Sequence, residues 1–191
     1  TKADFASRIK KEAVRMTGLI NDILMISRLE AKEAEVTFSD VRVSVLLEEI
    51  IDSLKPQAAE AQVFVHVDCQ PLMIHANLQQ MRELLTNLIS NAIKYNRPGG
   101  QVWINIRETD GQMVIRVKDN GVGIPSDSLD RIFERFYRVD KGRSRKQGGT
   151  GLGLSIVKHI VNFYHGTIHV SSEPDMGSEF TVFLPMFPEK G

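Results

Sequence analysis

Nine residues from Asn87 to Tyr95 bring together side chains that could bind a charged ligand. Asn87, Asn91 and Lys94 follow one another at steps of four and three residues, so a helix would place them in one stripe. Tyr95 lies one turn beyond Asn91. Amide oxygens suit a hard cation such as magnesium, and an ammonium group suits a phosphate. The solvated side of an amphipathic helix would show the same pattern, so the stripe alone leaves both interpretations open.

A second polar group, Asp119-Asn120-Gly121-Val122-Gly123-Ile124-Pro125, follows a predicted strand. Its glycines permit a close approach of the backbone. The Asp119 carboxylate could accept a hydrogen bond from an exocyclic amine such as that of adenine. Guanine presents a carbonyl at that place and would leave both acceptors unpaired, which is a strong basis for discrimination. Taken alone, Asp-Asn-Gly is more often only a turn.

A glycine-rich segment, Gly148-Gly149-Thr150-Gly151-Leu152-Gly153-Leu154, runs into a predicted helix. Glycines before a helix N-terminus expose backbone N–H groups that can bind phosphate. The segment lacks the Lys-Ser/Thr pair of a Walker loop, and it does not follow a strand as a dinucleotide-binding fingerprint would. By itself it indicates only a possible anion site.

An aromatic and basic segment, Phe133-Glu134-Arg135-Phe136-Tyr137-Arg138, precedes that loop. Two phenylalanines three residues apart could anchor a flexible loop to the core. Basic residues beyond them could reach phosphate oxygens when the loop closes; they are Lys141, Arg143, Arg145 and Lys146. The alternative for several of the four is a solvated charge run. The segment from about Arg138 to Gly149 is expected to be mobile until a nucleotide orders it.

Periodicity predicts the elements that would position these groups. Helices are expected over about 4–28, 45–61, the stretch around Asn87, and 152–164, with Pro56 kinking or splitting the second and Gly166 closing the last. Strands are expected near 36–41, 63–67, 72–75, 102–106, 113–117, 168–170 and 180–184, with a hairpin turn at Asp110-Gly111. The order predicts an α+β fold in which helices lie on one face of a mixed sheet.

Composition excludes several classes of protein. The 191 residues carry 24 basic and 24 acidic side chains, so charge offers no argument for nucleic acid or an anionic membrane as partner. One cysteine, Cys69, excludes an internal disulfide and a thiolate zinc cluster. No apolar run is long enough to cross a bilayer, and no signal peptide is visible. The helix over 4–28 has a broad apolar stripe, including Ile9, Met16 and Ile23, that needs a partner helix.

The four segments, in this order, resemble the nucleotide-binding motifs of bacterial sensor histidine kinases, members of the GHKL ATPase superfamily. Asn87 to Tyr95 is similar to the asparagine box, Asp119 to Gly123 to the first glycine box, Phe133 to Arg138 to the phenylalanine box, and Gly149 to Gly153 to the second glycine box. The resemblance implies a two-layer sandwich of a mostly antiparallel sheet and helices. It implies a catalytic ATP-binding domain over 35–191, preceded over 1–34 by the second helix of a dimerisation and phosphotransfer domain.

The resemblance also implies ligands and roles. Asn91, helped by Asn87, would hold Mg²⁺ on the phosphates of ATP, Lys94 would touch phosphate, and Tyr95 would lie against the base. Asp119 would bond the adenine amine between apolar walls. The other residues implied at the nucleotide are Gly121, Gly123, Ile124, Tyr137, Arg138, Lys141, Gly149, Thr150, Gly151, Leu152, Gly153 and Leu154. Implied partners are a response regulator receiver domain and a second copy of the parent, joined through the N-terminal helix. The resemblance further implies that this domain is cytoplasmic and that its parent lies in the bacterial plasma membrane.

The chain departs from the family in its histidines. Family members carry a phosphorylated histidine followed by an acidic residue and an arginine, and none of His66, His75, His159, His165 and His169 precedes an acidic residue. The acceptor is therefore expected outside this chain.

Three functions remain: the catalytic domain of a histidine kinase, a hydrolysing GHKL ATPase that drives a clamp, and an association fragment that only binds nucleotide. Hydrolysing relatives place a glutamate where Asn87 stands, and an amide cannot act as a general base, so Asn87 favours the kinase.

Overall fold

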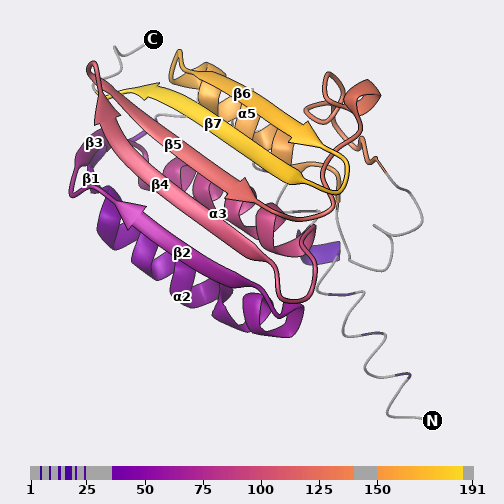
Figure 1. Ribbon diagram of the computed structural model, residues 1–191. Helices are drawn as coiled ribbons and strands as arrows, with labels where there is room; N and C mark the ends of the chain where they lie inside the picture. Colours follow the sequence, from indigo (N-terminus) through magenta and orange to yellow (C-terminus); the bar gives the residue numbers. More distant parts are fainter. Residues whose placement is uncertain are drawn as a thin grey trace.

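The computed structural model describes residues 36–139 and 150–186, together with eight positions from Phe5 to Leu24. A five-stranded sheet in the order β2-β4-β5-β7-β6 forms one layer, and the helices cover one of its faces (Figure 1). β2 runs parallel to β4, and the other neighbours are antiparallel. The elements are β1 (Ser39–Arg42), α2 (Val43–Ala61), β2 (Phe64–Cys69), β3 (Met73–Ala76), α3 (Leu78–Lys94), β4 (Gln101–Thr109), β5 (Gln112–Asp119), the short 3-10 helix η1 (Ser126–Ser128), α5 (Gly153–Phe163), β6 (Thr167–Glu173) and β7 (Gly177–Pro185).

This arrangement confirms the predicted α+β class and the mixed, mostly antiparallel sheet. The expected long N-terminal helix lies largely outside the described residues. Its described positions are helical, and the large apolar side chains among them are exposed: Phe5, Ile9, Met16, Ile20 and Leu24.

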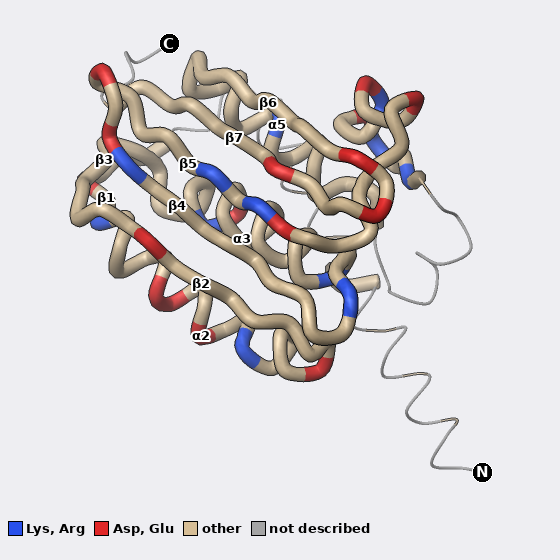
Figure 2. Tube along the Cα trace, viewed as in Figure 1, with Lys and Arg blue, Asp and Glu red and all other residues tan. Residues whose placement is uncertain are grey.

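The core lies between the sheet and the helices because the strands alternate. Val102, Ile104 and Ile106 of β4 are each no more than 1% exposed, and Ile104 pairs with Val117 of β5. Charged residues mark these strands in Figure 2; Arg116 is among those exposed at the alternate positions. The apolar row of β5 ends at a buried polar residue, Asp119, which the site uses.

The hairpin turn was predicted correctly, since Asp110 and Gly111 both have positive φ, of 52° and 74°. The predicted strand at 72–75 exists as β3, but it pairs with β1 in a separate two-stranded sheet. Local periodicity cannot reveal this, because it does not specify which strands pair.

The structure bears on two predictions about where helices break and end. α2 is not split at Pro56, which is exposed within a single continuous helix. The carbonyl that Pro56 leaves without a donor can therefore be hydrated. At the end of α5 the left-handed residue is His165 (φ 54°) rather than Gly166. The Gly166 N–H bonds the Val161 carbonyl at 2.8 Å, and glycine is needed because a Cβ would lie 2.3 Å from the Phe183 carbonyl oxygen.

A buried tyrosine joins the two helices that carry most of the site. Tyr164 is 0% exposed, and its hydroxyl donates to Oε1 of Gln80 at 2.6 Å and accepts from the backbone N–H of Asn77 at 2.9 Å. Burial raises the pKa of Tyr164 to about 12, so the hydroxyl stays protonated. Asn77 also caps α3, because its side chain accepts from the Gln80 N–H. The start of α3 is thus fixed to the end of α5.

Tyr164→Phe should lower the free energy of unfolding by about 1–3 kcal/mol, because it leaves a buried amide oxygen and a backbone N–H without their partner. Urea unfolding measures the loss. Gln80→Leu in the same background should recover part of it, since the orphaned amide is then removed. A single variant as stable as the wild type would contradict this role.

Candidate functional site

A cavity of about 460 Å³ opens where α3 and β5 end and α5 begins. It gathers residues from all four segments that the sequence singled out. The predicted site residues that line it are Asn87, Asn91, Lys94, Tyr95, Asp119, Gly123, Ile124, Tyr137, Arg138, Thr150, Gly151, Gly153 and Leu154. Segments far apart in sequence therefore meet around one space.

Four predicted site residues are not among those lining the cavity. Gly121 lies behind Asp119, where a Cβ would come 2.4 Å from the Tyr95 carbonyl oxygen. Leu152 is 0% exposed and belongs to the hydrophobic core. Lys141 and Gly149 lie outside the described residues, as does most of the segment for which mobility was predicted.

Sequence reasoning missed several lining residues, among them Ser90, Val122, Pro125, Ile132, Val139, Pro174, Ser178 and Phe180. Ser178 had a detectable signal: it shares the inward positions of β7 with Phe180, Val182 and Leu184, so it is a polar residue in an apolar row. Pro174 had none, because only folding brings the β6–β7 hairpin to the cavity.

One end of the cavity is a buried carboxylate. Asp119 is 6% exposed, and its Oδ1 accepts the Gly121 N–H at 2.8 Å. Burial raises the pKa of Asp119, and backbone hydrogen bonds from Gly121 and Ser178 offset part of that rise. Apolar side chains also line the cavity, among them Ile124, Ile132 and Phe180. Such an acceptor in an apolar wall favours a flat ligand with an amine at its edge.

Arg138 places a cationic guanidinium on the cavity wall. Its Nε and Nη2 are buried and have no hydrogen-bond partner within the described part of the chain. An unpaired buried donor is costly, and a guanidinium matches phosphate or carboxylate oxygens. Lys94 adds a second cation, with Nζ 5.4 Å from the centre of the Tyr95 ring. The cavity therefore combines an acceptor for an amine with donors for an anion.

The start of α5 borders the cavity, which Gly153 and Leu154 line. No side chain caps it, and Gly153 permits close contact, since a Cβ there would lie 2.6 Å from Asn87 Oδ1. Asn87 donates one amide hydrogen to the Glu83 carbonyl at 2.9 Å, and its Oδ1 is a hydrogen-bond acceptor. The preceding loop is tied by the Phe136 N–H, which bonds the Gly151 carbonyl at 2.9 Å. First-turn N–H groups at such a helix start can bind an anion.

The described residues contain no group of three or more His, Cys, Asp or Glu side chains that could hold a metal ion. Within the same residues, no helix has the length and apolar character needed to cross a membrane.

Comparison with known proteins gives a consistent result. Residues 76–188 match the family described as histidine kinase-, DNA gyrase B-, and HSP90-like ATPase. The sensor protein kinase WalK of Staphylococcus saprophyticus is 36% identical over 183 residues, which are 95% of this chain and 30% of WalK. The sensor-like histidine kinase SenX3 of Mycobacterium tuberculosis is 39% identical over 186 residues, 97% of this chain and 45% of SenX3. The crystal structure of full-length ShkA in complex with AMPPNP superposes with a TM-score of 0.83 and 28% identity, covering 99% of this chain and 40% of ShkA. The chain thus spans less than half the length of each.

The raised pKa of Asp119 predicts a pH-dependent stability. Because burial raises this pKa above 3.8 in the folded chain, the carboxyl group's contribution to stability is fully present below 3.8 and is lost as pH rises through the folded pKa. As the pH rises from below 3.8 to neutrality, the wild type should lose this contribution to its free energy of unfolding, whereas Asp119→Asn should not. The difference between the two proteins should therefore shift in favour of the variant. Urea unfolding at both pH values tests this, and a constant difference between the two proteins would contradict it.

Proposed function

Since the chain belongs to the histidine kinase-, DNA gyrase B-, and HSP90-like ATPase family, we propose that it is the ATP-binding catalytic domain of a sensor histidine kinase. In the parent, this domain binds Mg-ATP and donates the γ-phosphoryl group to a histidine outside this chain. A response regulator receiver domain then receives the phosphoryl group. WalK and SenX3, whose names identify them as sensor kinases, support this assignment.

The observation that carries the proposal is that one cavity combines a hydrogen-bond acceptor for an amine with cationic and backbone donors for an anion. Asp119 lines the cavity together with apolar side chains and accepts the adenine amine. The Arg138 guanidinium, whose Nε and Nη2 have no partner among the described residues, meets phosphate oxygens. The uncapped start of α5 adds backbone N–H groups for the same phosphates. The similar protein ShkA was crystallised with AMPPNP, which has the same chemical parts.

Mg²⁺ fits the amide oxygens on α3. Asn87 donates an amide N–H to the Glu83 carbonyl, and its Oδ1 is an acceptor; Asn91 lies one turn further along the same helix face. Bound Mg²⁺ supplies charge neutralisation at the phosphates. Lys94 adds a positive charge, and Tyr95 and Tyr137 provide flat surfaces beside the ligand. These residues bind and orient the nucleotide rather than take part in covalent chemistry.

Transfer is favoured over hydrolysis by Asn87. Its side chain cannot remove a proton from water, and it is already committed to the Glu83 carbonyl. A clamp ATPase would need a base at this position, so the alternative function lacks its central group.

The domain boundaries and the parent's assembly are part of the proposal. Residues 1–34 form the second helix of a dimerisation and phosphotransfer domain, and residues 35–191 form the catalytic domain. The exposed apolar side chains of the N-terminal helix, such as Ile9 and Met16, support a homodimer through that helix. The parent is a sensor at the bacterial plasma membrane with this domain on its cytoplasmic side, and it does not act on nucleic acid.

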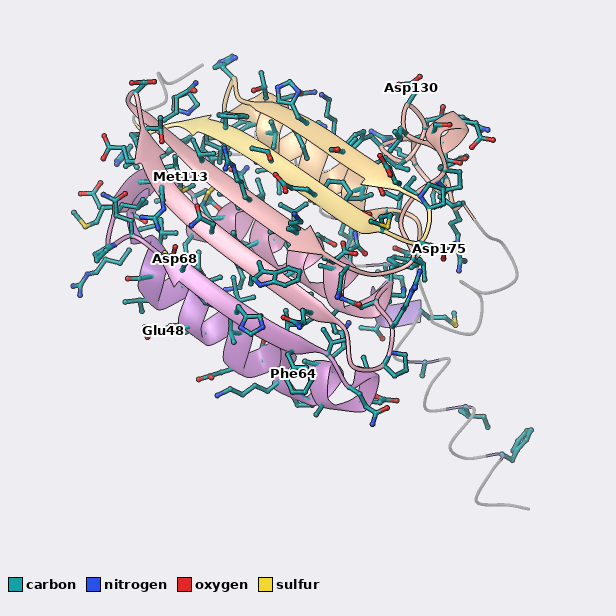
Figure 3. The ribbon with its side chains drawn as sticks, viewed as in Figure 1. Glu48, Phe64, Asp68, Met113, Asp130 and Asp175 are labelled. Carbon is teal, nitrogen blue, oxygen red and sulfur yellow. The ribbon has the colours of Figure 1, made fainter. Side chains whose placement is uncertain are left out.

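The chain should bind Mg-ATP, and Asp119→Asn should weaken binding by about tenfold or more, because a hydrogen bond to a charged acceptor is lost. Calorimetry measures both dissociation constants. Asp130→Asn is the matched control, since Asp130 is exposed on the loop after η1 (Figure 3) and should leave the affinity unchanged. Equal ATP affinity in the wild type and Asp119→Asn would overturn the role given to Asp119.

The chain alone should not phosphorylate itself on histidine, yet it should slowly phosphorylate a separately supplied phosphotransfer domain. Transfer in trans is slow because the tether that raises effective concentration is absent. Radiolabelled ATP with and without the acceptor domain, followed by acid treatment, makes the test. Acid-labile label on this chain alone would show that one of its own five histidines is an acceptor.

A further inference from the structure

The backbone of the β6–β7 hairpin packs closely against the loop that follows Asp119. A Cβ on Gly177 would lie 2.0 Å from the Asp119 carbonyl oxygen, and one on Gly123 would lie 1.9 Å from that of Glu173. The Asp175 N–H also bonds the Val122 carbonyl at 2.9 Å. Figure 3 labels Asp175 at the hairpin tip, beside this loop. Hairpin and loop therefore form one wall of the cavity.

A single hydroxyl lies inside that contact. Ser172 Oγ is 2.8 Å from the Ile124 backbone nitrogen, 2.8 Å from the Gly177 carbonyl oxygen and 2.9 Å from Ser178 Oγ. The Ile124 N–H can only donate, so Ser172 accepts there. The Gly177 carbonyl can only accept, so Ser172 donates its one hydrogen to that oxygen.

These bonds determine the direction of the third one. Without a second hydrogen, Ser172 can only accept from Ser178, and the Ser178 hydroxyl must donate to Ser172. Ser178 lines the cavity, and its backbone N–H bonds Asp119. With its hydrogen turned away, Ser178 offers the cavity only lone pairs, beside a carboxylate that does the same. Ser178 and Asp119 therefore both present hydrogen-bond acceptors to the cavity.

We propose that Ser172 is a positioning residue that determines base specificity: it fixes Ser178 as an acceptor, so that the cavity selects a purine with an amine at the 6-position over one with a carbonyl. The proposal rests on the nucleotide-binding function proposed above. Ser172 does not touch the ligand itself. It acts through the Ser178 hydroxyl and through the Ile124 backbone that it anchors.

ATP and ITP are the probes, because their bases differ at the 6-position, where ATP has an amine and ITP a carbonyl, and in the proton on the adjacent ring nitrogen. Ser172→Ala frees the Ser178 hydroxyl to rotate and donate to the ITP carbonyl. The dissociation constant for ITP divided by that for ATP should fall about tenfold, which corresponds to one hydrogen bond gained or lost at the base. Calorimetry on the whole chain measures the ratio, and general loosening of the fold would weaken both nucleotides alike.

Ser172→Thr and Ser172→Val form an isosteric pair that suits a strand and decides the question if the alanine variant does not fold. Threonine keeps the hydroxyl and should keep the wild-type ratio, whereas valine should lower it. Ser171→Ala is the matched control, since Ser171 is exposed on the other face of β6 and should not change the ratio. An unchanged ratio in the alanine and valine variants overturns the role of Ser172. A wild type that binds neither nucleotide overturns the proposed function instead.

Discussion

Contact between backbones without intervening side chains is the constraint on which the site depends. At Gly121 the loop after β5 meets the end of α3, where a Cβ would be 2.4 Å from the Tyr95 carbonyl oxygen. At Gly177 the β6–β7 hairpin meets the end of β5 itself. Asp119 is buried because three chain segments approach it this closely, and no residue larger than glycine would allow them to do so. The glycines thus determine where the carboxylate lies as well as how the loop turns.

Burial of Asp119 has an energetic cost that the fold offsets only in part. Two backbone N–H groups bond the carboxylate, yet its pKa remains raised, so the charged form is less well solvated than in water. A ligand amine would supply a further hydrogen bond where the protein leaves an acceptor open. Arg138 presents the converse case, because two of its nitrogens are buried without partners among the described residues. Both groups are poorly compensated by the protein alone, which is expected where a ligand completes the hydrogen bonding.

The sequence predicted those parts of the fold and site that depend on local pattern. Alternation located β4 and β5, and helical spacing located α3 with Asn87, Asn91 and Lys94 on one face. It did not predict the β1–β3 pairing, which joins segments more than thirty residues apart. It also missed Ser178 and Pro174, because the hairpin reaches the cavity only through packing. Leu152 was expected at the nucleotide, but an apolar residue among glycines can equally enter the core, where it lies.

One strained residue lies in the segment that leads to Tyr137 and Arg138. Phe136 has a φ of 63°, which is unfavourable for a bulky residue. The residue is 59% exposed, so burial of the side chain does not account for the conformation. Its N–H bonds the Gly151 carbonyl, and Gly151, at φ 77°, lies so close that a Cβ would be 2.9 Å from the Phe136 backbone. The strained backbone thus holds the segment bearing Tyr137 and Arg138 against the residues that lead into α5. Sparsely populated conformations persist where surrounding structure over-determines them. Here that structure is the junction that brings Arg138 and the first residues of α5 to the wall of one cavity, where an anion can meet both.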